Sequence, residues 1–112
     1  MDTIFHKIIS KDIPASIVHE DDDVIAFRDI NPAAPVHVLV VPKNYISGFS
    51  KFSELSDEQA GAYMKKIAFV ADKLGLSDGY RVVFNQGEHG GQTVPYIHAH
   101  ILGGGKLPGH SF

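Results

Sequence analysis

The sequence predicts an α+β fold in which a mainly antiparallel sheet carries one short and one long helix. Two observations lead to this prediction. The middle of the chain has a long helical spacing of apolar residues, and shorter apolar segments separated by turn-forming residues lie on both sides of it. Because the chain has 112 residues and 44% of them are hydrophobic, we expect residues 1–112 to form a single domain.

The first predicted element is a short helix within residues 3–11. Its apolar residues recur at helical spacing, Asp2 or Thr3 can cap its first turn, and Pro14 marks its end. Residues 17–27 then predict two short strands joined by an acidic turn, which we interpret as the solvated tip of a hairpin. The beginning of the chain is therefore expected to supply one helix and one hairpin.

The next predicted elements are a central strand and the long helix. Residues 37–41 are almost continuously apolar, as expected for a strand that is covered on both faces. Ser56 and Gln59 form a capping box in front of apolar residues at a spacing of three and four, and Gly75 supplies a left-handed stop. We therefore expect a helix over residues 57–74 and assign it a packing role.

The last third of the chain contains two more predicted strands and a glycine-rich loop. Residues 80–85 and 96–102 have strand patterns, and the loop of residues 86–93 (QGEHGGQT) lies between them. Glycines allow a backbone to turn its N–H groups toward an anion, so this loop can cradle a phosphate.

Two histidines on the last predicted strand lie close to this loop. Alternation along the strand places Tyr96, His98 and His100 on one face and the apolar residues between them toward the core. A neutral imidazole can attack phosphorus, and a second one can contact the phosphoryl oxygens or protonate the leaving group. The Thr93 hydroxyl and the Asn85 amide are near enough in sequence to stabilise the developing charge.

Other interpretations of these residues stay open. The two histidines could simply occupy the polar face of a half-buried strand, and the glycine-rich loop could be only a turn. The spacing of His98 and His100 also suits a zinc ion, with His37 or His110 completing the site. No acidic or cysteine partner is close in sequence, which weakens the metal interpretation.

Composition and charge argue against several other classes of protein. The sequence has no cysteine, which excludes disulfides, thiolate zinc ligands and a cysteine nucleophile. Its formal net charge is −3 without a dense basic stretch, so we do not expect nucleic acid as a partner. It starts without a signal-peptide pattern and contains no apolar run long enough to span a membrane, so we expect no membrane association and a cytoplasmic location.

Further segments carry a resemblance to a known family. In chain order they are IFHKII at 4–9, AFRDI at 26–30, APVHVLVVPK at 34–43 and GGQTVP at 90–95. Together with the paired histidines, they resemble the histidine triad (HIT) family, and specifically its Hint branch of nucleotide-binding phosphoramidases. The resemblance implies a HIT-like fold and a homodimer in which the sheet continues from one copy to the other.

The resemblance also implies roles for the histidines. In the family pattern His-φ-His-φ-His-φ-φ the middle histidine forms a nucleotidyl intermediate, and this position is His98 here. The third position, His100, contacts the phosphate, whereas the first position is Tyr96. His37 matches a histidine of the supporting hydrogen-bond network, and Tyr45 stands where the family often has another. We therefore expect the two tyrosines to substitute together.

A nucleotide pocket is the second implication of the resemblance. Asp29 matches the carboxylate that accepts hydrogen bonds from the ribose hydroxyls. The other matched positions form an apolar wall for the nucleobase and a loop that contacts the phosphate. They are Phe5, Ile8, Phe27 and Ile30 for the wall and Asn85, Gly91, Thr93 and Val94 for the loop.

The expected activity is hydrolysis of the P–N bond of purine nucleoside 5′-phosphoramidates, including compounds that resemble AMP-lysine. His98 attacks the α-phosphorus, the amine departs, and water releases the purine nucleoside monophosphate, without a metal or other cofactor. Alternatives are a nucleotide-binding or scaffolding protein, in which catalysis is weak because Tyr96 replaces the first triad histidine, and a metal-dependent hydrolase. A dinucleoside polyphosphate hydrolase from another branch of the family is a further alternative, although the stretch 90–94 favours Hint.

Overall fold

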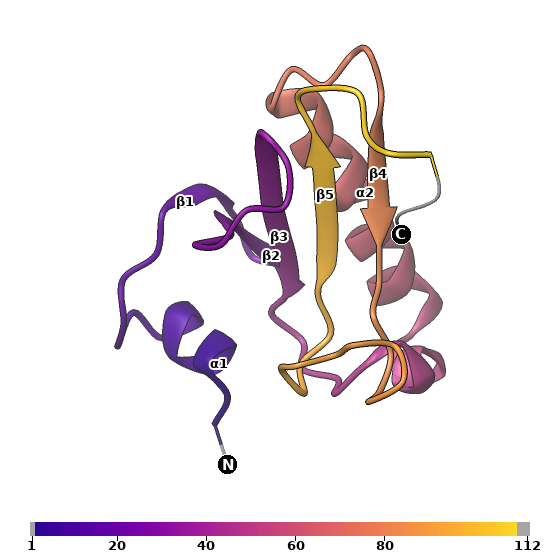
Figure 1. Cartoon of the computed structure of the whole chain (residues 1–112). Helices are drawn as coiled ribbons and strands as arrows, with labels where there is room; N and C mark the ends of the chain where they lie inside the picture. Colours follow the sequence, from indigo (N-terminus) through magenta and orange to yellow (C-terminus); the bar gives the residue numbers. More distant parts are fainter. Residues whose placement is uncertain (1, 110–112) are drawn as a thin grey trace.

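The computed structural model describes residues 2–109 and has a five-stranded sheet with strand order β1-β2-β3-β5-β4 (Figure 1). Every strand pair in the described part of the chain is antiparallel. The α+β prediction is therefore confirmed. In chain order the elements are α1 (Ile4–Ile9), β1 (Ile17–Glu20), β2 (Val24–Arg28), β3 (Val36–Pro42), the 3-10 helix η1 (Phe49–Glu54), α2 (Asp57–Lys73), β4 (Tyr80–Val83) and β5 (Ala99–Gly103).

Both α-helices begin at a capping box. The Ser56 side chain accepts from the Gln59 backbone N–H at the start of α2, as the sequence predicted, and Gly75 follows the helix with φ +74°. At the start of α1, Thr3 is the cap and the His6 side chain accepts from the Thr3 backbone N–H. The helix α2 packs against β2 and β5 and lies behind the sheet in Figure 1.

The central strand β3 places two other strands in register for the site. It pairs with β2 on one side and β5 on the other, so that Phe27 lies opposite Leu39 and Leu39 lies opposite His100. Directly paired residues share a face of the sheet, which puts these side chains in one row. The predicted burial of Ile97, Ala99 and Ile101 on the other side of the chain is confirmed, because each is at most 2% exposed.

Two predicted strand boundaries were wrong. The last strand begins at Ala99 instead of residue 96, and β4 ends at Val83 instead of residue 85. The reason for the late start of β5 is that the Ile97 N–H binds the Ile46 carbonyl, in the segment that follows β3, and the Tyr96 N–H binds Val94. These residues are held by specific contacts outside the sheet ladder. The 3-10 helix η1 was not predicted at all.

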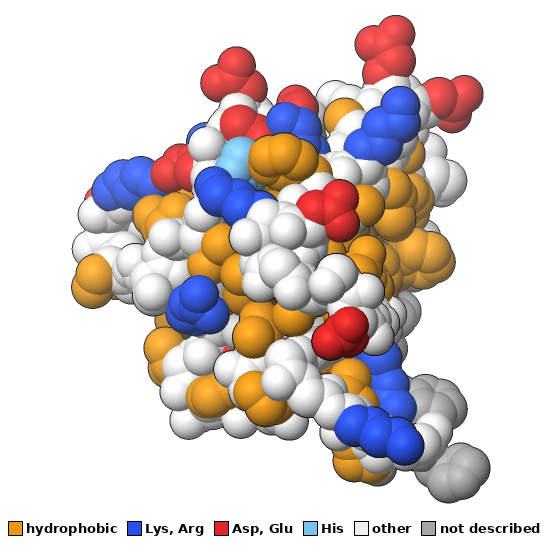
Figure 2. Space-filling model, turned by 90° about the horizontal axis from the view of Figure 1, so that it is seen from above, with side chains coloured by type: hydrophobic (Ala, Val, Ile, Leu, Met, Phe, Trp, Pro, Cys, Tyr) orange, Lys and Arg blue, Asp and Glu red, His pale blue; other side chains and the backbone are white. Residues whose placement is uncertain are grey.

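Lys and Arg side chains are interspersed with acidic and apolar ones on the face of the molecule that Figure 2 shows. No helix among residues 2–109 is long and apolar enough to cross a membrane.

Candidate active site

A cavity of about 380 Å³ gathers most of the sequence-predicted site residues. Its wall comes from α1, the segment after α1, the end of β2, the glycine-rich loop and the histidine-bearing segment. Asp29 and Ile30 line it, although Ile30 is 90% exposed and lies at the surface. The other predicted residues in the wall are Phe5, Ile8, Phe27, Thr93, Val94, His98 and His100.

Several wall residues were missed as site residues by the sequence analysis. They lie in three places: Ile4 on α1, residues 13–15 after it, and Arg28 and Leu39 on the neighbouring strands. The alternation of strand residues could have identified Leu39, because it is two positions from His37 on β3.

His98 is held with one ring nitrogen committed to a backbone carbonyl. Its Nδ1 lies 2.8 Å from the Tyr96 carbonyl oxygen and must donate to it, so the neutral ring carries its lone pair on Nε2. The side chain is only 7% exposed, and the edge of the Phe5 ring packs against it at 4.9 Å between centroids. Burial lowers the pKa of His98, against the opposing effects of the Tyr96 carbonyl and Asp29. The imidazole is therefore neutral at neutral pH.

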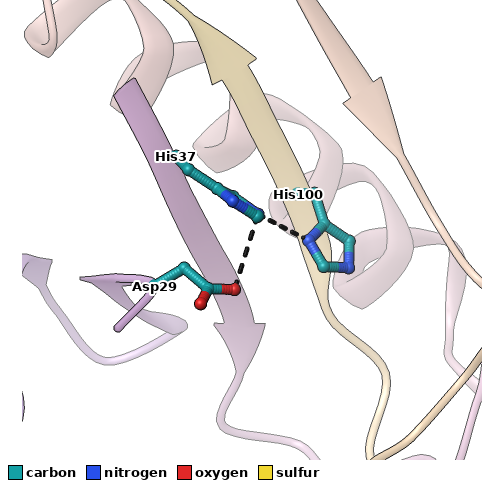
Figure 3. Close-up of side chains that lie close together, drawn as sticks. All are labelled: Asp29, His37 and His100. Carbon is teal, nitrogen blue, oxygen red and sulfur yellow. Dashed lines mark hydrogen bonds and ion pairs between the residues drawn. The ribbon is translucent and has the colours of Figure 1, made fainter. Parts of the chain in front are cut away.

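His100 has the opposite tautomer because a backbone amide sets it through His37, whose ring contacts both His100 and Asp29 (Figure 3). The Ala33 N–H donates to His37 Nδ1 at 3.0 Å, so the proton of neutral His37 is on Nε2. This Nε2–H faces His100 Nδ1 at 2.9 Å and Asp29 Oδ2 at 3.5 Å. His100 Nδ1 is then an acceptor, and the proton of its own ring is on Nε2.

The charge state of His100 follows from its surroundings. Burial lowers its pKa to about 4, and the positive charges that His98 and His37 would carry act in the same direction. His37 is itself 8% exposed and lies behind His100, outside the cavity wall. At neutral pH the site thus holds one imidazole with a lone pair on Nε2 and a second imidazole with a proton on Nε2.

The glycine-rich loop is held in place by Gln92, a residue that the sequence analysis did not single out. Its Nε2 donates to the carbonyls of Ser47 at 2.8 Å and Val94 at 3.0 Å, and its Oε1 accepts from the Gly87 N–H at 2.9 Å. An amide side chain between glycines can satisfy several backbone groups at once, which was the available signal. These bonds fix the direction in which Thr93 and Val94 enter the cavity.

Two of the predicted loop residues do not reach the cavity. Asn85 Nδ2 donates to the Gly90 carbonyl at 2.8 Å, which closes the loop on itself, and Gly91 lines a neighbouring surface hollow. Gly90 is closely packed, because an added Cβ would lie 2.3 Å from the Gln86 carbonyl oxygen. The roles of Asn85 and Gly91 in phosphate contact stay predictions.

One group of side chains among the described residues could hold a metal ion, and it consists of Asp29, His37 and His100. Their ligand atoms lie within 4.8 Å of one another, so the fold supplies the acidic partner that the local sequence lacks. His98 is not part of this cluster, and His110 lies outside the described residues. The donor types suit zinc, but ligands at about 2.0–2.1 Å from a tetrahedral ion are about 3.3 Å apart. The 2.9 Å between His37 and His100 fits a hydrogen bond better, so the spacing does not fit the ion.

The fold and the paired histidines define a class of protein. The family model of the HIT domain matches residues 10–107, and the chain belongs to the HIT family, in its Hint-like branch. It is a hydrolase of this family.

Individual relatives support this assignment over most of the chain. The chain is 49% identical over 107 residues to the "14 kDa zinc-binding protein" of Zea mays, covering 94% of this chain and 84% of the maize protein. It is 46% identical over 107 residues to "Adenylylsulfatase HINT1" of Arabidopsis thaliana, covering 94% of this chain and 73% of the plant protein. The solved structure of a HIT family hydrolase from Legionella pneumophila superposes with a TM-score of 0.87 at 39% identity, covering 97% of this chain and 98% of the other.

Proposed function

We propose that the protein hydrolyses the P–N bond of purine nucleoside 5′-phosphoramidates, with His98 as the nucleophile. The observation that carries this proposal is the neutral His98 with its lone pair on Nε2, in the wall of a cavity that is otherwise mainly apolar. Such a cavity suits a nucleobase, and a buried neutral imidazole suits attack on phosphorus.

The nucleoside is placed by the N-terminal part of the cavity. The side chains of Phe5, Ile8 and Phe27 form an apolar wall for the base. Asp29 holds Oδ1 on the Asn31 N–H at 2.8 Å and Oδ2 at 3.5 Å from His37 Nε2, and the remaining lone pairs of this carboxylate accept from the ribose hydroxyls. The α-phosphate then lies at the end of the cavity that holds Thr93, His98 and His100.

The reaction proceeds in two displacements. His98 Nε2 attacks the α-phosphorus, the P–N bond breaks, and the departing amine takes a proton from solvent, while the His100 Nε2–H donates a hydrogen bond to a phosphoryl oxygen. Water then attacks the nucleotidyl-histidine, gives its proton back to solvent and releases the nucleoside monophosphate. The Thr93 hydroxyl donates to a phosphoryl oxygen as negative charge develops there.

The deciding experiment is turnover of adenosine 5′-phosphoramidate, with and without EDTA, by the wild type and His98→Ala. The matched control is His19→Gln, since His19 is on β1 and does not line the cavity. We expect AMP release that resists the chelator, persists in His19→Gln and is lost in His98→Ala. AMP binding without turnover in the wild type would instead identify a nucleotide-binding protein.

The EDTA arm also tests the metal-dependent alternative. That alternative rests on the name of the maize relative, because the spacing of Asp29, His37 and His100 does not fit a zinc ion. Activity that EDTA abolishes and zinc restores would support it. Adenylyl sulfate belongs in the same assay, because the Arabidopsis relative is named an adenylylsulfatase.

We also propose that two copies of the chain associate through β4, which is an edge strand. Tyr80 and Val82 on this strand are 39% and 43% exposed, so this edge of the sheet carries apolar side chains that a second copy can cover. Light scattering is expected to give twice the mass of one chain. Val82→Lys should reduce this to a monomer, and a wild-type monomer would contradict the proposal.

A further inference from the structure

Two segments that flank the nucleophile are joined by reciprocal tyrosine bonds. One segment is 42–47, at the end of β3 and beyond it, and the other is 92–98, before β5. The Tyr96 hydroxyl in the second segment donates to the Pro42 carbonyl in the first. The Tyr45 hydroxyl in the first segment donates to the Pro95 carbonyl in the second at 2.9 Å. We call this pair, Tyr45 and Tyr96, the tyrosine brace.

The two rings of the brace also contact each other. Their centroids are 4.8 Å apart, and the His6 ring lies 4.8 Å from each of them. Tyr96 is 1% exposed, whereas Tyr45 is 50% exposed. Because each tyrosine binds the segment that carries the other, and the rings touch, replacing one of them alone would leave the other with an altered partner.

The brace acts on the residue that orients His98. Tyr96 supplies the carbonyl that accepts from His98 Nδ1 at 2.8 Å, and the same residue is anchored by its hydroxyl at Pro42. The sheet ladder does not reach this residue, because β5 begins at Ala99. The peptide unit that contains the Tyr96 carbonyl is held by the Ile97 N–H, which binds the Ile46 carbonyl, and the tyrosine brace holds the residues on its N-terminal side and joins the two segments.

We propose that Tyr45 and Tyr96 are positioning residues that hold the Tyr96 carbonyl and thereby fix the tautomer and the direction of the His98 ring. The proposal rests on the hydrolytic function proposed above for His98. It implies that the tyrosine in the first triad position preserves the alignment of the nucleophile without an imidazole. Burial raises the pKa of Tyr96 to about 12, so its hydroxyl remains a donor at all pH values at which the protein works.

The first test compares steady-state kinetics of Tyr96→Phe and Tyr45→Phe with a control that loses an equivalent bond elsewhere. The control is Tyr63→Phe, because the buried Tyr63 hydroxyl donates to the Val40 carbonyl at 2.8 Å and Tyr63 does not line the active-site cavity. Both Tyr63→Phe and Tyr96→Phe should lower the melting temperature. Only the brace variants should lower kcat.

The expected sizes follow from the loss of alignment. A misplacement of 1 Å can cost about 100-fold, so we expect Tyr96→Phe to lower kcat about tenfold with KM within about twofold of the wild type. Tyr45→Phe should lower kcat less, about threefold, because water can replace an exposed hydroxyl. Equal kcat in the wild type and Tyr96→Phe would overturn the proposal, as would an equal loss in Tyr63→Phe.

A second measurement does not depend on turnover. Long-range ¹H–¹⁵N correlation spectra report which nitrogen of His98 carries the proton. We expect Nδ1–H alone in the wild type and Tyr63→Phe, and a mixture of tautomers in Tyr96→Phe. An unchanged His98 spectrum in Tyr96→Phe would refute the brace. If the wild type turns over no phosphoramidate, the proposed function fails, and a changed spectrum would still establish the brace.

Discussion

Replacing His37 by phenylalanine tests whether a histidine outside the cavity controls the one that faces the phosphate. His37 relays a backbone constraint, since it accepts from the Ala33 N–H at 3.0 Å and its Nε2 lies 2.9 Å from His100 Nδ1. Phenylalanine keeps the ring volume but removes both interactions. The proton of His100 is then free to move to Nδ1, which would take it away from the nitrogen that donates to the phosphoryl oxygen.

The magnitude follows from the burial of this pair. His37 is buried and His100 is half-buried, and leaving a buried acceptor without its donor costs about 1–3 kcal/mol. If this cost is felt in the transition state, kcat/KM should fall roughly ten- to a hundredfold. The fall should be mainly in kcat, because His37 does not line the nucleotide cavity.

The assay is hydrolysis of adenosine 5′-phosphoramidate, with thermal melting to show that each variant is folded. His37→Gln is the matched variant, since a glutamine amide N–H can take the place of Nε2–H as donor to His100. We expect it to recover a substantial part of the activity that His37→Phe loses. Activity of His37→Phe within twofold of the wild type would refute the relay, and so would equal losses in the two variants.

Four further outcomes are expected. Because the pKa of His98 is lowered from 6.5, the neutral nucleophile persists as pH falls, and the acidic limb of kcat/KM should lie below pH 6.5 in a profile measured from pH 4.5 to 8.5. The pKa of His100 is about 4 in the folded protein and 6.5 in the unfolded chain, so the unfolded chain takes up a proton first as the pH falls. The free energy of unfolding measured in urea should therefore decrease from pH 6.5 to pH 4. The decrease should be smaller in His100→Asn. Gly90→Ala should disrupt the loop and lower turnover, because its Cβ would meet the Gln86 carbonyl oxygen at 2.3 Å. Gly61→Ala, with nothing within 4 Å of its added Cβ, should raise stability by about 0.5–1 kcal/mol in thermal melts.

The fold could be predicted where local chemistry and tertiary structure agree. The helix expected over residues 57–74 forms over Asp57–Lys73, because its capping box and apolar stripe specify it without help from the rest of the chain. The strand expected over 96–102 was placed too early, because the backbone of Tyr96 and Ile97 is bound by Val94 and Ile46 instead of the sheet. Period-two alternation predicts a direction for each side chain, but it does not identify the hydrogen-bond partner of each amide.

Proximity in the chain also limited prediction of the site. His98 and His100 were recognised together because they are two residues apart, but the contact of His100 with His37, and of His37 with Asp29, depends on the pairing of β3 with β5 and β2. No local pattern contains that pairing. The zinc interpretation was weakened for lack of a nearby acid, and Asp29 shows that the relevant neighbour was distant in sequence.

His98, just before β5, and His100, on β5, differ in function because opposite backbone groups determine which ring nitrogen carries the proton. A carbonyl, that of Tyr96, binds His98 Nδ1 and leaves a lone pair on Nε2. An amide, that of Ala33, acts through His37 to leave a proton on His100 Nε2. Each of these backbone groups is itself held in place. The Tyr96 residue is held by its hydroxyl, which binds the Pro42 carbonyl at the end of β3, and the Ala33 amide lies in the turn that leads into β3. Since β3 therefore supports both histidines, distortion of this strand should impair the nucleophile and the hydrogen-bond donor together, and separate variants of Tyr96 and His37 are needed to distinguish their contributions.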